Sequence, residues 1–301
     1  MQRPAKPFTP VRFRIQPPCD FMKIGIVGYG FVGRALEAGF NSDVVLLKID
    51  PKLNTKIIDL VDFNPDAIFI CVPTPMNEDF SQDISILKEV VNSINKLNLK
   101  SLVVLKSTVL PDYVSEIESM TPNFIYNPEF LREKHAIDDF INSKLIIFGG
   151  KKEIAKKLAE IYRNYTICVC TDYQYTDAIS ASLIKYSINS FLATKVSFFN
   201  ELHHLFLKSE SAESWNKFID MISKDNRIGS SHMQVPGHDH RYGFGGACLP
   251  KDSSAFLEYA YKKDMELNVL KSAIKTNNSI RASYNTKTNR ELDQKIRFKG
   301  D

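Results

Sequence analysis

No apolar run in this 301-residue sequence reaches the roughly 18 residues that a membrane-spanning helix needs. Glycine and proline are sparse, at 13 and 14 residues, which excludes a low-complexity or fibrous chain. Basic residues barely exceed acidic ones, 39 against 35, and both are spread along the chain. This weak net charge of +4 argues against a nucleic-acid-binding protein and is compatible with one site for a small anion.

Cysteine is scarce, and its spacing indicates no metal. The chain has five cysteines, at positions 19, 71, 168, 170 and 248, and no pair shows C-x-x-C spacing. We therefore predict no metal site. Cysteine usage of this kind is typical of a reducing compartment, so we expect a cytoplasmic protein. Cys168 and Cys170 alternate with apolar residues in Thr166–Cys170, which predicts one face of a buried strand.

The first 21 residues differ from the rest of the chain. They contain five prolines and four basic residues, and no apolar stretch of signal-peptide length. So many prolines argue against the amphipathic helix of a transit peptide. We predict a disordered leader over residues 1–21, with Met22 as an alternative start of the protein.

Apolar strands alternate with helices in residues 22–171. Strands are predicted at Lys23–Val27, Val44–Ile49, Ala67–Val72, Leu102–Leu105, Phe124–Tyr126, Leu145–Phe148 and Thr166–Val169. Helices are predicted at Phe31–Phe40, Asp83–Leu97 and Lys151–Tyr162. Strands that are apolar throughout and alternate with helices predict an α/β domain, a doubly wound parallel sheet covered on both faces.

Residues 172–285 predict a small all-helical domain. Residues 151–228 contain neither glycine nor proline, and Asp172 to about Lys208 has the apolar spacing of one long connecting helix. Shorter helices are predicted at Glu213–Ile222, Ser253–Lys263 and Leu267–Tyr284. A helix of this length suits a two-fold interface, so we expect a homodimer. Residues 286–301 form a polar tail that we expect to be frayed.

A glycine turn follows the first predicted strand and opens the first helix. It is the GxGxxG sequence made of Gly28, Tyr29, Gly30, Phe31, Val32 and Gly33. The first glycine permits a tight turn, the second admits a pyrophosphate, and the third allows close helix packing. Asp50 ends the second strand, where a carboxylate accepts the ribose hydroxyls of NAD and repels the 2′-phosphate of NADP. This combination predicts a Rossmann-type site for NAD.

Two threonines follow later strands of the predicted sheet. Thr74 lies in Cys71–Pro75 and Thr108 in Lys106–Val109. Ligands of parallel sheets bind outside the carboxyl ends of the strands, which would place both threonines beside cofactor or substrate. From position alone, a turn-forming hydroxyl is an equally good interpretation of each.

Two pairs of polar residues are spaced four apart. Glu129 and Glu133 follow a short strand and share one face if a helical turn comes next. Lys185 and Asn189 lie on the predicted long helix, where a lysine and an amide on one face can bind an oxyanion. Taken alone, each pair is more typical of a solvated helix face.

The segment GFGGACLPKD, from Gly243 to Asp252, carries the densest signal. Its glycines let the backbone press against a ligand. Lys251 can lower the pKa of the Cys248 thiol, and Asp252 can act on a proton or a water. The glycines and the two charged residues beside Cys248 favour a nucleophilic cysteine over the alternative of a buried structural one.

Taken together, these segments resemble the UDP-glucose/GDP-mannose dehydrogenase family. The strings NPEFLRE at 127–133 and GFGGACLPKD at 243–252 carry the resemblance, with DNRIG at 225–229 between them. The match runs in order through about residues 22–285 and is closest to the UDP-glucose 6-dehydrogenase branch. The resemblance implies a four-electron oxidation of a sugar C6 alcohol to the acid, with two NAD⁺.

The resemblance also implies roles for individual residues. Cys248 would add to the C6 aldehyde as a thiolate, and Glu129 would be the base for thioester hydrolysis. Beside those two, the residues implied to be catalytic are Lys185 and Asn189 at the oxyanion, and Asp252 and Thr108 at a water or proton. Residues implied at the cofactor, beyond the glycine turn and Asp50, are Thr74, Thr108, Glu133 and Lys251. Residues implied at the sugar nucleotide are Glu129, Phe130, Leu131, Lys185, Asn189, Arg227 and Gly245.

Three features depart from the family pattern. Ser182 stands where the family usually has a glutamate, and Pro111-Asp112 stands where Pro-Gly is usual. Family members also carry a third domain that closes over the nucleotide, and this chain ends about 50 residues after Asp252. An open site implies weak binding of the sugar nucleotide unless a second subunit or a separately encoded cap domain covers it.

Other functions stay open at this point. The chain could be an NAD-binding remnant without turnover, but a remnant has no need of the residues from Cys248 to Asp252. A generic hydroxyacid dehydrogenase would need no cysteine nucleophile. The same chemistry on GDP-mannose or a UDP-N-acetylhexosamine is equally compatible with the sequence.

Overall fold

The structure is a computed structural model that describes residues 21–298. The predicted leader therefore lies outside the described residues, except for Phe21. Within residues 21–298, no helix combines the length and the apolar character that crossing a membrane requires.

A seven-stranded sheet, in the order β2-β1-β3-β4-β5-β6-β7, forms the first part of the molecule. The strands are β1 (Met22–Val27), β2 (Val44–Ile49), β3 (Ala67–Ile70), β4 (Leu102–Leu105), β5 (Phe124–Tyr126), β6 (Ile146–Gly149) and β7 (Tyr173–Thr176). In the parallel register from β2 to β5, Val27 pairs with Ile49 and Ile70, and Leu105 with Ile70 and Tyr126. The carboxyl ends of five strands therefore lie level, and the residues that follow them share one edge.

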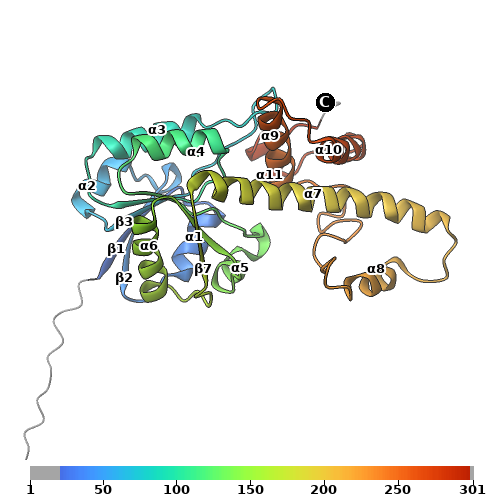
Figure 1. Cartoon of the computed structure of the whole chain (residues 1–301), viewed down its shortest axis with the longest axis horizontal. Helices are drawn as coiled ribbons and strands as arrows, with labels where there is room; N and C mark the ends of the chain where they lie inside the picture. The colour runs from blue at the N-terminus through green and yellow to red at the C-terminus, as the bar shows by residue number, and fades with distance from the viewer. Residues whose placement is uncertain (1–20, 299–301) are drawn as a thin grey trace, which may run out of the picture.

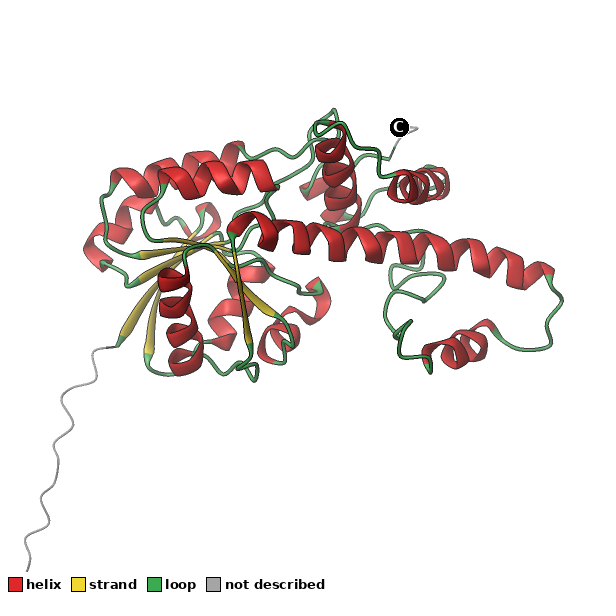
Figure 2. Ribbon diagram, viewed as in Figure 1, coloured by secondary structure: helices red, strands yellow, loops and turns green. Residues whose placement is uncertain are grey.

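Helices cover both faces of the sheet, as Figure 2 shows. One face packs against α1 (Phe31–Gly39), α5 (Ala136–Ile141) and α6 (Lys152–Tyr165). The other packs against α2 (Leu60–Phe63), α3 (Ser85–Lys96), α4 (Pro111–Met120) and the start of α7 (Ala178–Lys208). Alternate side chains of β1 to β6 enter two separate cores, so the α/β prediction is confirmed.

The last part of the sheet departs from the prediction. β6 runs antiparallel to β5, so the sheet is not parallel throughout. The predicted strand Thr166–Val169 is wrong: its backbone bonds to Gly39 and Ile141 at the ends of α1 and α5, and Val169 is 63% exposed. Cys168 and Cys170 therefore lie in a loop. The strand forms later, as β7, which pairs in parallel with β6.

Helix α7 connects the sheet to the second part of the molecule (Figure 1). It begins at Ala178 rather than at Asp172, because Asp177 caps it by accepting the backbone N–H of Ser180. α9 (Leu249–Tyr261) and α10 (Asn268–Arg281) pack against its middle, and α8 (Trp215–Ser223) packs near its end. The first helical residue of α9 follows Cys248 directly, earlier than the sequence predicted.

The expected frayed tail is wrong for residues 286–298. α11 (Asn289–Asp293) forms there, capped by Thr288, and Glu291 within it is 1% exposed. Beyond it, Ile296 and Phe298 are buried against Met76 of the sheet domain. The polar composition hid this segment because it buries only two apolar side chains, Ile296 and Phe298, together with the carboxylate of Glu291.

Candidate active site

The turns after β3 and β4 bring Thr74 and Thr108 together at the carboxyl edge of the sheet. The Thr74 hydroxyl donates to the Thr108 carbonyl over 3.0 Å, and both side chains are buried. Gln82 donates to the same carbonyl over 2.7 Å and accepts the Leu110 N–H, which fixes the turn. Pro111-Asp112, which departs from the family pattern, forms the start of α4. Proline there occupies the first turn of the helix, a position that proline favours.

The glycine turn fits a dinucleotide. A Cβ on Gly28 would lie 2.7 Å from the Cys71 carbonyl, and one on Gly33 would lie 2.6 Å from the Gly28 carbonyl. A Cβ on Gly30 would meet nothing within 4 Å, so the space before the N-terminus of α1 is open for a phosphate. Asp50 faces the turn and accepts the Tyr29 N–H over 2.8 Å.

Glu129 and Lys185 form a buried ion pair. Lys185 Nζ donates to Glu129 Oε1 over 3.2 Å, and their side chains are 3% and 7% exposed. No helical turn follows Pro128; instead Glu129 turns back to accept the Leu131 N–H over 2.6 Å. Burial lowers the pKa of Lys185, but the carboxylates of Glu129 and Asp252 outweigh it and raise that pKa above its usual value.

Asn189 and Asp252 link α7 to α9. The Asn189 amide donates to Asp252 Oδ2 over 2.7 Å, and Lys251 Nζ donates to the other oxygen of the same carboxylate. Asp252 is 1% exposed, so all of its bonds are made inside the protein. Lys185 and Asn189 thus lie on the buried side of α7, where the sequence alone favoured a solvated face.

Cys248 lies at the start of α9, beside both buried pairs. Burial, Glu129 and Asp252 raise the pKa of its thiol to about 12, although Lys185 and Lys251 act to lower it. Lys251 therefore acts on the thiol pKa in the direction that the sequence suggested, but burial and the two carboxylates outweigh it. The thiol is protonated here and must lose its proton when it attacks.

Two residues expected at the site are engaged elsewhere. Glu133 pairs with Arg290 Nε over 2.6 Å, at the side of Phe31. Arg227 pairs with Asp225 over 2.5 Å, and its side chain is 88% exposed beyond α8. Phe130 does approach the site, because Lys185 Nζ lies 5.3 Å from its ring centre.

Sequence reasoning missed a buried polar layer beneath the site. Lys106 Nζ donates to Asn127 Oδ1 over 2.9 Å, and the Tyr162 hydroxyl donates to the same oxygen over 2.6 Å. Burial lowers the pKa of Lys106 to about 8. Ser182, the departure from the family pattern, donates to the Val109 carbonyl over 2.6 Å. In the sequence, the only sign of this layer is that polar residues stand where the pattern of the strands and helices predicts buried apolar ones.

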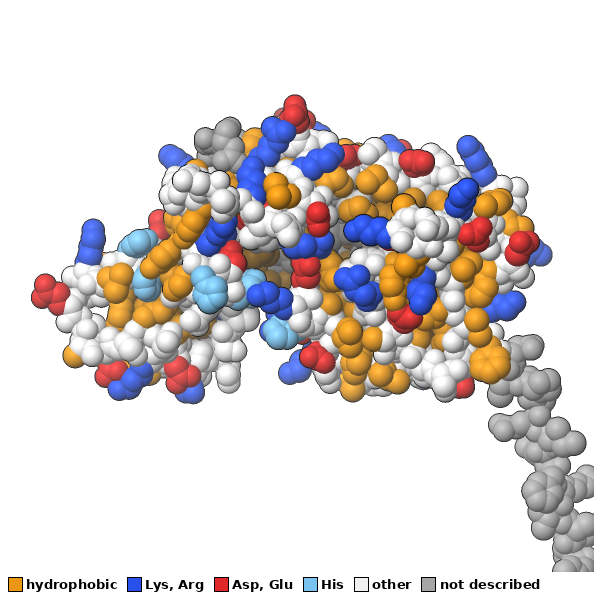
Figure 3. Space-filling view, turned by 180° about the vertical axis from the view of Figure 1, so that it is seen from behind, with side chains coloured by type: hydrophobic (Ala, Val, Ile, Leu, Met, Phe, Trp, Pro, Cys, Tyr) orange, Lys and Arg blue, Asp and Glu red, His pale blue; other side chains and the backbone are white. Residues whose placement is uncertain are grey.

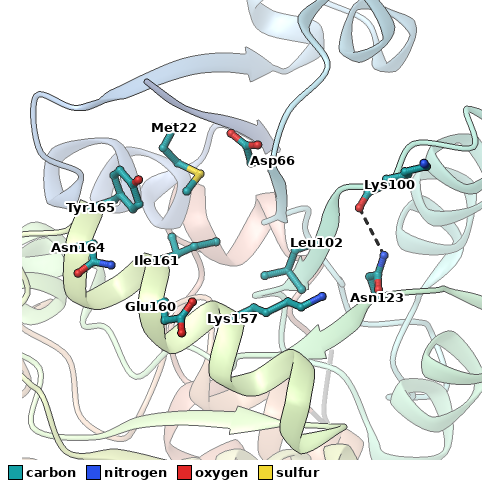
Figure 4. A pocket seen from close by; sticks show the side chains of 10 residues that line it. All are labelled: Met22, Asp66, Lys100, Leu102, Asn123, Lys157, Glu160, Ile161, Asn164 and Tyr165. Atoms are coloured by element: carbon teal, nitrogen blue, oxygen red, sulfur yellow. Dashed lines mark hydrogen bonds between the residues drawn. The ribbon is translucent and has the colours of Figure 1, made fainter. Parts of the chain in front are cut away.

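One hollow of the described structure lies away from this site. A cavity of about 410 Å³ lies at the opposite, amino edge of the sheet, as Figure 4 shows. Met22, Leu102 and Tyr165 line it with a mixture of polar and charged side chains. Parallel sheets bind ligands at the carboxyl edge, so chemistry rather than cavity size locates the site.

Histidines gather at the α8 end of the molecule, as Figure 3 shows. His203 and His204 lie on α7, and His204 stacks on Tyr242. In the part of the chain that the structure describes, no group of three His, Cys, Asp or Glu side chains converges to hold a metal. The cluster is a packed aromatic layer with Trp215.

Known proteins match both the sheet domain and the helical part of the chain. Residues 52–166 match the NAD binding domain of the UDP-glucose/GDP-mannose dehydrogenase family, and residues 179–279 match its central domain. The UDP-glucose 6-dehydrogenase of Campylobacter jejuni is 30% identical over 291 residues, which cover 85% of this chain and 72% of the relative.

Two further proteins extend this comparison. The UDP-glucose 6-dehydrogenase of Rickettsia felis is 35% identical over 223 residues, 71% of this chain, and the match spans about half of the relative, 48%. The solved UDP-glucose dehydrogenase from Pyrobaculum islandicum superposes with a TM-score of 0.71 at 25% identity, over 88% of this chain and 70% of that one. The chain therefore belongs to the UDP-glucose/GDP-mannose dehydrogenase family, with that family's NAD binding domain and central domain.

Proposed function

We propose that this protein oxidises the C6 alcohol of a nucleotide sugar to the acid, in two steps that each use one NAD⁺. The observation that carries the proposal is the convergence of Glu129, Lys185, Asn189, Cys248 and Asp252 from three separate parts of the fold. UDP-glucose is the proposed substrate, because it is the sugar nucleotide in the names of the Campylobacter and Rickettsia relatives. The chemistry alone would equally suit GDP-mannose or a UDP-N-acetylhexosamine.

The cofactor site would be formed by the glycine turn Gly28–Gly33, Asp50 and Thr74. NAD⁺ held there supplies a hydride acceptor for each of the two oxidations. The chain's own part is to hold the sugar carbon at the carboxyl edge of the sheet and to exclude water from it. We propose that Thr108, whose turn is fixed by Gln82, borders this position.

Cys248 would retain the aldehyde after the first oxidation. Its sulfur adds to the carbonyl carbon, the thiol proton leaves, and the carbonyl oxygen becomes the hydroxyl of a thiohemiacetal. We propose that Asp252, held by Asn189 and Lys251, receives or relays that proton. Lys185 and Asn189 would donate to the oxygen while it carries negative charge.

Glu129 would act after the second oxidation, when the thioester must be hydrolysed. In the structure its carboxylate pairs with Lys185 and lies in a dry environment. It would take a proton from the attacking water, and Cys248 would then leave as the thiolate and recover its proton. We propose that Phe130, Leu131, Gly245 and Arg227 contact the sugar nucleotide, Arg227 only after leaving Asp225.

We also propose a cytoplasmic location for the enzyme. Cys71, Cys168, Cys170 and Cys248 are all free, which supports a reducing, cytoplasmic location. We further propose that the chain works as two units, a cofactor unit that ends with β7 and a helical unit that begins with α7.

A homodimer built on α7 is part of this proposal. An apolar stripe with spacings of three, four and seven residues runs along the helix, and its members are Ile184, Ile188, Phe191, Phe198, Leu202 and Leu205. Phe191 is 68% exposed and Phe198 is 58% exposed, and exposed apolar side chains gathered on one face are typical of an interaction surface. A straight stripe of this kind complements a second copy of itself across a two-fold axis.

The proposed function is tested by measuring NADH formation with a panel of nucleotide sugars. We expect two NADH for each UDP-glucose consumed, with the uronic acid as the product. An inactive NAD-binding remnant would bind NAD⁺ and produce no NADH with any sugar. A hydroxyacid dehydrogenase would yield one NADH from a small hydroxy acid and would keep its activity after Cys248 is blocked.

A further inference from the structure

The last described segment of the chain, residues 286–298, connects the two parts of the site, and we name it the C-terminal clasp. It contains α11 and lies beyond residue 279, where the match to the family's central domain ends. One end contacts the loop that leads to Cys248. The other end contacts the turn that carries Thr74.

Glu291 anchors the first end. Its side chain is 1% exposed, and Oε1 accepts the Gly246 N–H over 3.3 Å and lies 3.7 Å from Arg281 Nη1. Its second oxygen, Oε2, accepts the Thr288 N–H over 2.7 Å in a capping box. A fully buried carboxylate with these partners is held in one place.

Arg281 completes the anchor from the last turn of α10. Its side chain is 2% exposed, and it binds Asp239 Oδ2 over 2.8 Å and the Gly243 carbonyl over 2.9 Å. Arg281 therefore faces two carboxylates, those of Asp239 and Glu291. If one of these carboxylates is removed, less negative charge balances the buried guanidinium, which is then free to shift.

The glycine loop is shaped to this anchor. A Cβ on Gly245 would lie 2.5 Å from Glu291 Oε1 and 2.6 Å from Arg281 Nη1, so the pair presses directly on the backbone. Gly243 and Gly246 have φ values of +73° and +79°, which favour glycine. Gly246 precedes Cys248 by two residues, so its position sets where α9 and the thiol begin.

The other end of the clasp is fixed to the cofactor domain. Ile296 and Phe298, which are 1% and 5% exposed, pack on Met76. The Met76 N–H donates to the Gln294 carbonyl over 3.1 Å. Met76 follows Thr74 by two residues, so the clasp spans from the thiol loop to the turn that borders the cofactor.

We propose that Glu291 is a positioning residue, which through Gly245 and Gly246 holds the Cys248 thiol at a fixed place relative to the Thr74 turn. Its meaning in catalysis rests on the proposed function. Two successive oxidations at one carbon require a constant position of the thiol relative to the cofactor. The contacts themselves do not depend on the identity of the substrate.

The test compares Glu291→Gln with Asp293→Asn in the full chain. Glu291→Gln keeps the side chain's shape and removes the charge opposite Arg281, whereas Asp293 is a 60% exposed carboxylate on the same helix. We expect Glu291→Gln to lower kcat about tenfold with KM for NAD⁺ within about twofold of wild type. We expect Asp293→Asn to match wild type in both.

A second readout needs no substrate. Iodoacetamide alkylation of Cys248, followed by mass spectrometry, should change rate at least about threefold in Glu291→Gln and not in Asp293→Asn. This separates the two ideas: if wild type oxidises no nucleotide sugar, the proposed function fails while the alkylation contrast still tests the clasp.

The double variant Ile296→Ala, Phe298→Ala releases the other end and leaves Glu291 in place. It should alter alkylation in the same direction, and it tests the proposal if Glu291→Gln does not fold. Alkylation rates and kcat within about twofold of wild type in the folded variants would overturn the proposal. So would a loss in kcat matched by an equal loss of NAD⁺ binding, which indicates general destabilisation.

Discussion

Asn189 donates its side-chain amide to Asp252 over 2.7 Å, which joins the middle of α7 to the first turn of α9. Burial, Glu129 and Asp252 together raise the pKa of the neighbouring Cys248 thiol. The same carboxylate that would receive the thiol proton therefore also adds to the burial and the Glu129 charge that keep the thiol protonated. This relationship protects the cysteine from premature reaction, because the thiolate is the reactive form.

Replacing Asp252 by Asn should lower the pKa of the Cys248 thiol below about 12, since one of the negative charges that oppose the thiolate is removed. The pH at which iodoacetamide alkylation reaches half its maximal rate should fall accordingly. Asp225→Asn, at an exposed carboxylate beyond α8, is the matched control. An unchanged or higher midpoint in Asp252→Asn would show that Asp252 does not act on the thiol.

Replacing Cys248 by Ala should abolish formation of the acid and spare the cofactor. The variant should bind NAD⁺ with wild-type affinity, because the glycine turn and Asp50 are far along the chain and untouched. Product analysis by mass spectrometry and NAD⁺ titration by fluorescence measure the two effects. Two NADH per sugar at the wild-type rate in Cys248→Ala would rule out the covalent mechanism.

Asp50 should make the protein select NAD over NADP. Its carboxylate faces the glycine turn through the Tyr29 N–H, so a 2′-phosphate placed there meets a like charge. We expect kcat/KM to favour NAD⁺ by at least about tenfold, and Asp50→Asn to narrow that ratio. Equal efficiency with both cofactors in wild type would refute the role of Asp50.

The apolar stripe on α7 predicts a second subunit. Phe191→Glu should convert a dimer into monomers, because two buried glutamates would meet across the two-fold axis. Sedimentation velocity measures the change. Ile179→Glu alters another exposed apolar residue of the same helix and should leave the dimer intact. A wild-type protein that sediments as a monomer would refute the interface.

The sequence predicted those parts of the site whose signal is local. The glycine turn and the segment from Gly243 to Cys248 are short strings in which each residue type has a steric reason, visible without knowing the fold. Lys185 and Asn189 were ambiguous, since only the packing of α9 on α7 shows that their helix face is buried.

Longer-range features were missed for physical reasons. Tyr173–Thr176 is a polar edge strand without an apolar pattern, so the helical spacing that follows it was extended back to Asp172. In the clasp, Thr288 and Glu291 form a capping box whose spacing was visible, yet burial of Glu291 depends on Arg281 in another helix. Such pairings are set by tertiary packing, which composition does not report.

Lys106 predicts how stability depends on pH. Burial lowers its pKa from 10.5 to about 8, so the folded protein gives up this proton more readily than the unfolded chain. Between those two values the unfolded state holds more protons, and stability therefore rises with pH from about 8 to 10.5. Below pH 8 the buried cation costs stability on the order of 3 kcal/mol.

Lys106→Met should remove this cost and its pH dependence. Asn127 keeps its bond from Tyr162, so the substitution leaves no buried acceptor unpaired. We expect the variant to be more stable than wild type by about 2–3 kcal/mol at pH 7, with the difference shrinking as pH rises toward 10.5. Urea unfolding at pH 7 and pH 10 measures both free energies. Lys96→Met, on the surface of α3, is the control and should show no such trend. A Lys106→Met protein that is less stable than wild type at pH 7 would mean that the cation is compensated in the folded state by the Glu129 carboxylate that faces it.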